Sequence, residues 1–302
     1  MIYPPFLKKD DLVALITPSG KTTIVVVERA SNFIKELGYK VVTGDNVLSS
    51  FNQFGGTDQE RIDDLNKVIS SPDIKAVWCT RGGHGTLRIC DKVDFTPLKN
   101  NPKWLIGFSD ITVLHSKLQK EAGLVSVHGP MALNLEKPDI ENTGVLNLWN
   151  LLKGDIPDYN LPYNSYNRTG SAEGELVGGN LTLLNSLKGS RYDFDPKGKI
   201  LFLEDLGEKL YHVDRMIQGF KLAGKFEGLK GLVIGQMTEM SDGETPFGRD
   251  AHGIIVDAVK EYGFPVISNF NAGHDRQNEP VIMGAKVKID VTGQSSHFAH
   301  IG

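Results

Sequence analysis

The sequence contains few cysteines, no excess of basic charge and no long apolar run. Cys79 and Cys90 are the two cysteines among 302 residues, too few for a disulfide scaffold. Lys and Arg number 33 against 37 Asp and Glu, for a formal net charge of -4, and this balance gives no sign of the basic face typical of nucleic-acid-binding proteins. The longest apolar runs, such as 12–16 and 200–203, are strand-sized, so no transmembrane helix, which needs about 18 consecutive apolar residues, is expected.

The N-terminus lacks the pattern of a secretory signal peptide, because the charged residues at 8–11 precede any long apolar stretch. Apolar residues make up 40% of the chain and charged residues 23%, which is ordinary for a globular protein with a core. We therefore expect a cytoplasmic protein that binds neither nucleic acid nor membrane.

Spacings typical of metal ligands are also missing. The sequence contains no His-Glu-x-x-His and no Cys-x-x-Cys pattern. His297 and His300 have a His-x-x-His spacing, but no carboxylate partner lies near them in the sequence. We predict no metal site and no cofactor.

The first half of the chain alternates short apolar runs with helical patterns, which predicts right-handed βαβ crossovers and a mostly parallel sheet flanked by helices. The expected strands are 12–17, 39–43, 74–80, 104–108 and 124–128, and the expected helices are 24–37, 57–69, 87–93 and 110–121. The second of these helices opens with a capping box at 57–60.

The alternation breaks between 153 and 174, where the residues are polar, turn-rich and aperiodic. Strands at 200–204, 232–236 and 266–270 and helices at 211–223 and 252–262 follow, and the tail 281–301 is typical of antiparallel strands. We predict an α/β fold with an N-terminal domain over 1–153, a linker or functional loop over 154–173, and a smaller C-terminal α/β domain with a mixed sheet over 174–302.

Two loops that follow expected strands could carry chemistry. Residues 80–86 hold Gly82 and Gly83 between a strand and a helix, and bare N–H groups in such a loop can bind phosphate or stabilise an oxyanion. A tight turn explains the same residues. Ser109 stands where a strand runs directly into a helix, the geometry of a nucleophile elbow, although Ile111 occupies the place of the elbow's final glycine. Ser109 could also simply cap the helix.

Glu204 and His274 stand at or just after two later strands. A carboxylate at the end of a buried strand could orient a histidine, and Asp205 and Glu208 are close competitors for that role. His274 lies in a loop among small residues, where it is well placed for proton transfer. Ser109, Glu204 and His274 therefore favour a serine hydrolase with the chain order nucleophile, acid, histidine.

Taken together, these motifs resemble the L,D-carboxypeptidase family of serine peptidases, the muramoyl-tetrapeptide carboxypeptidases, which also includes the microcin C immunity peptidases. The resemblance covers essentially the whole chain. The segments that carry it are 16–19, 81–85, 106–112, 178–181, 203–205, 214–215 and 273–274.

The resemblance implies a metal-free triad of Ser109, Glu204 and His274, divided between an N-terminal α/β domain and a smaller C-terminal domain. It also implies an oxyanion hole that uses the main-chain N–H of Asp110 and of Gly82 or Gly83. Members of the family remove the terminal D-alanine from cytoplasmic murein tetrapeptides during peptidoglycan recycling, and they are commonly homodimers. His84 departs from the tyrosine or phenylalanine that is frequent in the family at its position.

The expected function is therefore release of terminal D-alanine from murein tetrapeptides. A carboxypeptidase must hold a free carboxylate beside the scissile bond, and Arg81 is a candidate for that charge. One alternative is a peptidyl-nucleotide amide hydrolase of the microcin C type, which an aromatic loop over the site would favour; Tyr163 and Tyr166 lie in a candidate loop. A non-enzymatic alternative is a two-domain protein that binds a small ligand.

Overall fold

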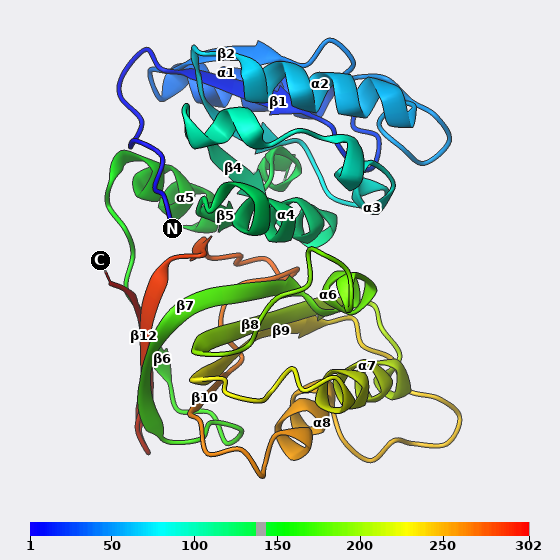
Figure 1. Cartoon of the computed structure of the whole chain (residues 1–302), viewed down its shortest axis with the longest axis vertical. Helices are drawn as coiled ribbons and strands as arrows, with labels where there is room; N and C mark the ends of the chain where they lie inside the picture. Colours follow the sequence, from blue (N-terminus) through cyan, green and yellow to red (C-terminus); the bar gives the residue numbers. More distant parts are fainter. Residues whose placement is uncertain (137–142, 302) are drawn as a thin grey trace. The chain divides into compact units, whose positions relative to one another are not determined.

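The computed structural model describes residues 1–136 and 143–301, and its contacts divide the chain into two compact units (Figure 1). Unit 1 consists of Met1–Ile156 and Glu279–Ile282. Unit 2 consists of Pro157–Asn278 and the residues from Met283 onward. Each unit holds its own sheet with helices packed against it, which confirms the predicted α/β class.

Unit 1 has a six-stranded sheet in the order β11-β5-β4-β3-β1-β2. The pairings of β1 with β2 and β3, of β3 with β4, and of β4 with β5 are parallel, as the alternating pattern predicted. The strands are β1 (Leu12–Ile16), β2 (Lys40–Thr43), β3 (Ile74–Cys79), β4 (Trp104–Gly107), β5 (Ser126–His128) and β11 (Val281–Met283). Because parallel strands end at the same edge of a sheet, the loops after β1, β3 and β4 emerge side by side.

The helices of unit 1 are α1 (Ile24–Glu36), α2 (Asp58–Ser70), α3 (Thr86–Ile89), α4 (Thr112–Ala122) and α5 (Thr143–Lys153), with short 3₁₀ turns η1 (Cys90–Lys92), η2 (Thr96–Lys99), η3 (Ser109–Ile111) and η4 (Ala132–Glu136). Of these, α1, α2 and α4 follow the strands as expected, whereas α5 was not predicted. The capping box of α2 is present, since the side chains of Thr57 and Glu60 each accept the other residue's main-chain N–H. The expected helix at 87–93 is instead divided into α3 and η1.

Unit 2 has a seven-stranded mixed sheet in the order β10-β9-β8-β7-β12-β13-β6. The pairings from β7 through β10 are parallel and those from β7 through β12 and β13 to β6 are antiparallel. The mixed sheet and the antiparallel pairing of β12 and β13 in the tail are therefore confirmed, whereas the first strand of the tail, β11, belongs to the sheet of unit 1. The strands are β6 (Tyr159–Pro162), β7 (Gly170–Asn180), β8 (Lys199–Leu206), β9 (Gly231–Thr238), β10 (Val266–Ser268), β12 (Lys286–Val291) and β13 (Ser295–His300).

The segment 154–173, expected to be a linker or functional loop, contributes to this sheet. It contains β6 and the first residues of β7. β6 is a four-residue edge strand that pairs only with β13 among the described pairings. A short edge strand that ends in proline has no need of an apolar periodicity, which is why the sequence pattern does not reveal it.

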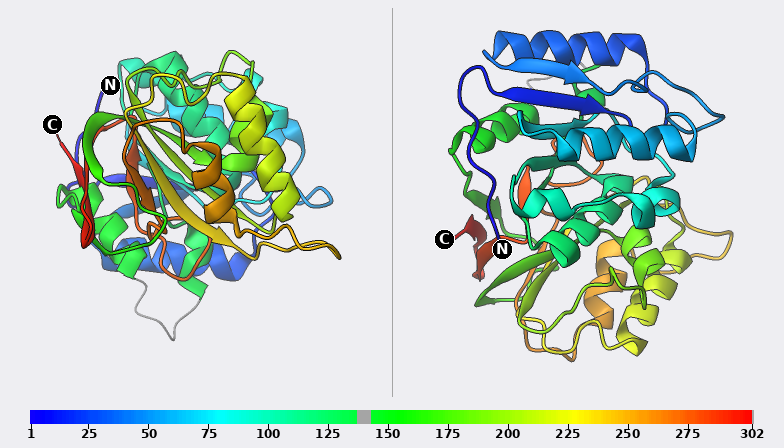
Figure 2. Two further views of the ribbon diagram at one scale, coloured as in Figure 1. Left: turned by 90° about the horizontal axis from the view of Figure 1, so that it is seen from below. Right: turned by 45° about the horizontal axis from the view of Figure 1, so that its top comes forward.

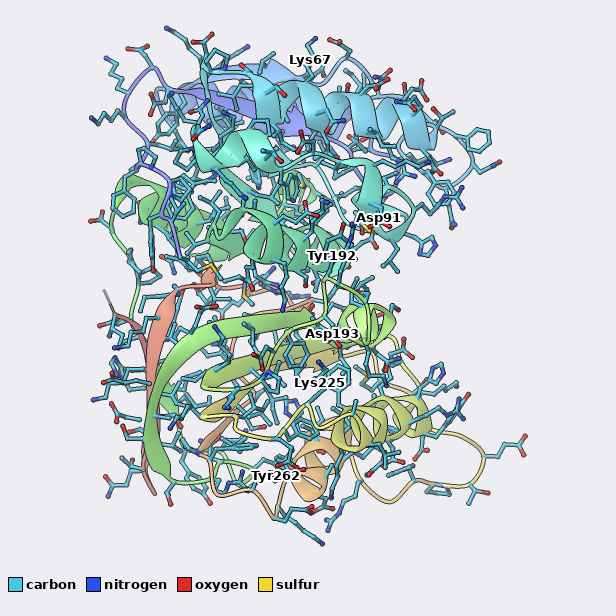
Figure 3. The ribbon with its side chains drawn as sticks, viewed as in Figure 1. Lys67, Asp91, Tyr192, Asp193, Lys225 and Tyr262 are labelled. Carbon is cyan, nitrogen blue, oxygen red and sulfur yellow. The ribbon has the colours of Figure 1, made fainter. Side chains whose placement is uncertain are left out.

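One face of the unit 2 sheet carries the helices α6 (Leu181–Leu187), α7 (Leu210–Leu222) and α8 (Ala251–Ala258) (Figure 2). Leu201 and Leu203 of β8 point into the core that these helices share. The connection from α6 to β8 also forms an ion pair with the turn after α7, because Lys225 Nζ lies 2.8 Å from Asp193 Oδ2 (Figure 3). Packing on this face fixes the direction of β8 and therefore the place where Glu204 emerges.

Candidate active site

Ser109 occupies a sharp turn between β4 and α4. Its φ is +63°, a left-handed conformation that a residue other than glycine rarely adopts, and such strain is concentrated at functional sites. A Cβ on Gly107 would lie 2.9 Å from Ile111 Cγ1, so the turn packs too tightly for a side chain at Gly107. The N-cap of η3 is Phe108 and that of α4 is Ile111, so Ser109 caps neither helix.

His115 supports this turn from α4. Its Nε2 lies 2.9 Å from the carbonyl oxygen of Gly107, and because a carbonyl only accepts, Nε2 carries the proton. Complete burial lowers the pKa of His115 to about 4, so the ring is neutral at physiological pH. No sequence pattern indicates this role of His115, because its contact with Gly107 requires the folded strand–helix turn.

The glycine loop after β3 lies against Ser109. A Cβ on Gly82 would be 3.0 Å from Ser109 Cβ and 3.2 Å from its Oγ, so glycine permits this approach. The carbonyl of Gly82 accepts a hydrogen bond from Gly20 N at 3.1 Å. The described residues contain no cis peptide bond, so the N–H of Gly83, which shares the peptide with that carbonyl, points away from Gly20.

Arg81 lies beside this loop and its side chain is engaged with main-chain carbonyls. Nε donates to Gly82 O at 3.3 Å and Nη1 to Lys21 O at 3.2 Å. A guanidinium has five N–H donors, so these two bonds leave capacity for an anion. The main role visible in the structure is to join the loops after β1 and β3.

In unit 2, Glu204 and His274 form a short hydrogen bond. His274 Nδ1 lies 2.7 Å from Glu204 Oε2, and the glutamate side chain is fully buried. Burial acts to lower the pKa of His274, but the charge of Glu204 and this hydrogen bond outweigh it, so the pKa is raised above its ordinary value. Because a carboxylate accepts, Nδ1 donates to Glu204 and the lone pair of the neutral ring is on Nε2.

The loop that carries His274 is held by Gln236 at the end of β9. The side-chain amide accepts from Asp275 N at 2.8 Å and donates to Gln277 O at 2.7 Å. Gly273 has a φ of +141°, and a Cβ there would lie 3.1 Å from Glu204 Oε2, so the histidine loop passes directly against the acid. No local sequence pattern points to Gln236, since its partners are about forty residues away.

The two competing acids are occupied elsewhere in unit 2. Glu208 Oε2 lies 2.9 Å from His212 Nδ1, and Oε1 lies 3.0 Å from Thr182 Oγ1. Burial raises the pKa of Asp205 to about 6, and its carboxylate accepts hydrogen bonds from the side chains of Asn180 and Thr182. Of the three acids, Glu204 is the one that bonds to His274.

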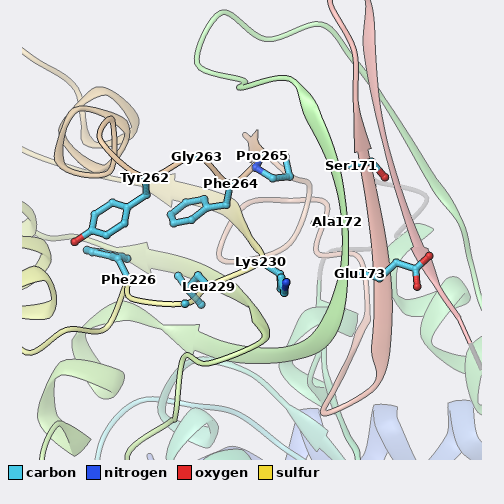
Figure 4. A pocket seen from close by; sticks show the side chains of 11 residues that line it. Ser171, Ala172, Glu173, Phe226, Leu229, Lys230, Tyr262, Gly263, Phe264 and Pro265 are labelled. Carbon is cyan, nitrogen blue, oxygen red and sulfur yellow. The ribbon is translucent and has the colours of Figure 1, made fainter.

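One pocket of unit 2 lies at the other edge of its sheet. It measures about 610 Å³ and has Lys230 and Pro265, which directly precede β9 and β10, in its lining, and Phe226 and Tyr262 stand on one wall (Figure 4). It therefore lies at the starts of parallel strands, opposite the edge where α/β sheets bind ligands. Within 1–136 and 143–301, no group of three His, Cys, Asp or Glu side chains is arranged to hold a metal, and no helix is long and apolar enough to cross a membrane.

Comparisons with known proteins give matches over most of the chain. Residues 13–129 match the LD-carboxypeptidase N-terminal domain and residues 173–289 match the LD-carboxypeptidase C-terminal domain. A Bacillus subtilis protein named "Probable murein peptide carboxypeptidase" is 31% identical, over 97% of this chain and 93% of its own.

Two solved structures share the fold. Muramoyltetrapeptide carboxypeptidase from Oxalobacter formigenes is 27% identical with a TM-score of 0.87, covering 95% of this chain and 97% of its own. The microcin C7 self immunity protein MccF, in complex with aspartyl sulfamoyl adenosine, is 21% identical with a TM-score of 0.88, covering 100% and 99%. Because MccF is only 21% identical to this chain, the similarity to it shows a shared fold and nothing more.

Proposed function

Because the chain belongs to the LD-carboxypeptidase family, a family of peptidases, we propose that it is a serine carboxypeptidase that releases terminal D-alanine from murein tetrapeptides. The observation that carries this proposal is the 2.7 Å bond between Glu204 Oε2 and His274 Nδ1. It fixes the imidazole tautomer that a general base requires. The name of the relative from Oxalobacter formigenes supports the substrate class.

In the proposed reaction, Ser109 is the nucleophile. Nε2 of His274 takes the proton of the Ser109 hydroxyl as its oxygen attacks the scissile carbonyl, and Glu204 stabilises the resulting imidazolium. His274 then returns the proton to the departing amine of D-alanine. Water repeats the cycle on the acyl-enzyme and regenerates Ser109.

The negative oxygen of the tetrahedral intermediate would be stabilised by two main-chain donors in unit 1. The N–H of Asp110 lies in the first turn of η3, where a helix leaves its N–H groups without an intrahelical partner. Of Gly82 and Gly83, the direction of the shared peptide favours Gly83 as the second donor. Losing one such donor typically costs about 3 kcal/mol of transition-state stabilisation.

The proposal is tested by the products formed from a synthetic murein tetrapeptide. Mass spectrometry should detect free D-alanine and the tripeptide and no other cleavage. Amidation of the terminal carboxylate should abolish cleavage, because Arg81 is proposed to pair with that charge, and a terminal L-alanine should greatly weaken it. Efficient cleavage of the amidated or L-alanine peptide would contradict the proposal.

The same assay distinguishes the alternatives. A peptidyl-nucleotide amide hydrolase would prefer a peptidyl adenylate to the tetrapeptide, and the microcin-related structure makes that comparison worthwhile. A small-ligand-binding protein would release no product from either. We further propose that the protein is a cytoplasmic homodimer acting in peptidoglycan recycling, and light scattering coupled to gel filtration tests the dimer.

A further inference from the structure

The side chain of Asp110 joins three neighbouring loops of the unit 1 sheet. It is 1% exposed, and its Oδ2 accepts from Ser19 Oγ at 2.6 Å and from Thr86 N at 2.9 Å. The main-chain oxygen of Asp110 accepts from Thr86 Oγ1 at 2.7 Å. Ser19 follows β1, Thr86 follows β3 and Asp110 follows β4, which are adjacent strands in the sheet.

These bonds hold the glycine loop at both of its sides. Thr86 ends the loop and is bound directly to Asp110. Ser19 is bound to Asp110, and the next residue, Gly20, donates its N–H to the carbonyl of Gly82. The Asp110 carboxylate therefore fixes the Gly82–Gly83 peptide through two separate paths.

Arg61 reinforces the same junction from α2. Its side chain is fully buried, and Nη1 donates to Pro18 O at 2.8 Å, one residue before Ser19. A Cβ on Gly85 would lie 2.6 Å from this Nη1, so the guanidinium also lies against the end of the glycine loop. Burial lowers the pKa of Arg61, while its ion-pair partner Asp58 and, to a smaller extent, the negative charge of Asp110 act against that shift.

A buried carboxylate is costly unless its hydrogen bonds repay the lost hydration. An aspartate that served only to cap the N-terminus of a helix could do so at the protein surface, without being buried. The hydrogen bonds of the Asp110 carboxylate instead go to the loops after β1 and β3, which indicates that the carboxylate orders this junction.

We propose that the Asp110 side chain is a positioning residue that holds the Gly82–Gly83 peptide against Ser109 and so sets the geometry of the oxyanion donors. This role is separate from that of the Asp110 main-chain N–H, and it rests on the proposed function of Ser109. Donors to an oxyanion act only when they are placed to within a few tenths of an ångström. Loosening the carboxylate should therefore lower kcat and leave KM largely unchanged.

Ser19→Ala is the main test, because it removes one donor to Asp110 and alters neither Ser109 nor the glycines. Asn46→Ala is the matched control. Asn46 lies in the loop after the edge strand β2, and its Nδ2 donates at 3.0 Å to Asp64, another buried carboxylate of unit 1. Ser19→Ala should lower kcat on the tetrapeptide by ~10- to 10²-fold, the cost of a small misplacement of reacting groups. Both variants should lower the thermal midpoint of unfolding by a similar amount, and Asn46→Ala should leave kcat unchanged.

Two further readouts separate positioning from stability. The rate at which a fluorophosphonate labels Ser109 should fall in Ser19→Ala in parallel with kcat, and circular dichroism should show an intact fold. Asp110→Asn, which keeps the shape but removes the charge, should also lower kcat, and the double variant should lose less than the two single losses combined.

The outcomes distinguish this proposal from the proposed function. If the wild-type protein releases D-alanine and Ser19→Ala and Asp110→Asn retain kcat, the positioning role is refuted and the proposed function stands. If both variants raise KM without lowering kcat, the carboxylate acts in binding and the positioning role is again refuted. A wild-type protein that neither releases D-alanine nor is labelled at Ser109 overturns both.

Discussion

The protonation state of His274 determines the pH range in which the proposed reaction can proceed. A general base must be neutral, and Glu204 raises the pKa of His274 above its ordinary value of 6.5 although burial acts to lower it. The same carboxylate that orients the ring therefore narrows the pH range in which the ring can accept a proton.

The pH profile of kcat/KM should show this. The acidic limb should have its midpoint above 6.5, because protonation of His274 removes the base as the pH falls through its raised pKa. In Glu204→Gln the largest of the charges that raise the pKa of His274 is gone, while burial and the smaller effects of Asp205 and Glu239 remain, so the midpoint of the residual activity should move downward. An acidic limb that stays in place in Glu204→Gln would show that another group controls it.

The choice between Glu204 and Glu208 is open to a direct comparison. Glu204→Gln should lower kcat by about 10⁴-fold, which is the loss typical when the triad acid of a chymotrypsin-type peptidase is replaced by its amide. Glu208→Gln should have a much smaller effect, because Glu208 bonds to His212 and Thr182 and not to His274. Steady-state kinetics on the tetrapeptide decide the matter, and a larger loss at Glu208 would refute the assignment.

Single residues differ in how well the sequence indicates them. Ser109, Glu204 and His274 stand at strand ends, where the alternating pattern itself points to sites. The partners of Asp110 do not follow from any local pattern, because Ser19 lies 91 residues away and is identified only by its hydrogen bond. Gln236 is similar, since its amide binds a loop that the sequence places elsewhere.

At the level of strands and helices, most elements of the alternating βα pattern were predictable, even short strands such as β5 and β10, whereas β6, β7 and β11 were not. The buried strands β1, β3 and β8 read as continuous apolar runs because both faces of a parallel sheet are covered. β11 has three residues and lies at the edge of the unit 1 sheet, beside β5, about 150 residues earlier in the chain. Its place depends on long-range pairing, so the sequence assigned it to the antiparallel tail.

A glycine in β7 offers a test of how closely the central strands of unit 2 approach. Gly178 has a φ of +128°, and a Cβ there would overlap the main-chain carbonyl of Phe202 in β8. Gly178→Ala should lower the free energy of unfolding by about 2–5 kcal/mol, from backbone strain and overpacking together. Gly263→Ala is the control, because a Cβ there meets no atom within 4 Å. Urea unfolding measures both, and equal stability of the two variants would contradict the described register of β7 and β8.

At the level of the whole molecule, the groups proposed for catalysis come from both units. Ser109 and the glycine loop belong to unit 1, and the Glu204–His274 pair belongs to unit 2. Both sheets present these groups at the carboxyl ends of parallel strands. In the proposed reaction, unit 1 would supply the nucleophile and the oxyanion donors, and unit 2 would supply the base and its acid.

The proposed reaction uses side chains and main-chain N–H groups alone, so metal removal should have no effect. Dialysis against EDTA should leave the rate of D-alanine release unchanged, since His274 supplies the base and the oxyanion is stabilised by hydrogen bonds. The rate is measured before and after dialysis and after addition of zinc. Inhibition by EDTA that zinc reverses would contradict a metal-free serine mechanism.

The central claim is that Ser109 is the nucleophile and that the Glu204–His274 pair activates it. Its most direct test is reaction of the intact protein with a fluorophosphonate probe, followed by peptide mapping of the adduct by mass spectrometry. We expect a single adduct on Ser109, no adduct in Ser109→Ala and a much slower reaction in His274→Ala. An adduct on another residue, or equal labelling of the wild type and His274→Ala, would contradict this claim.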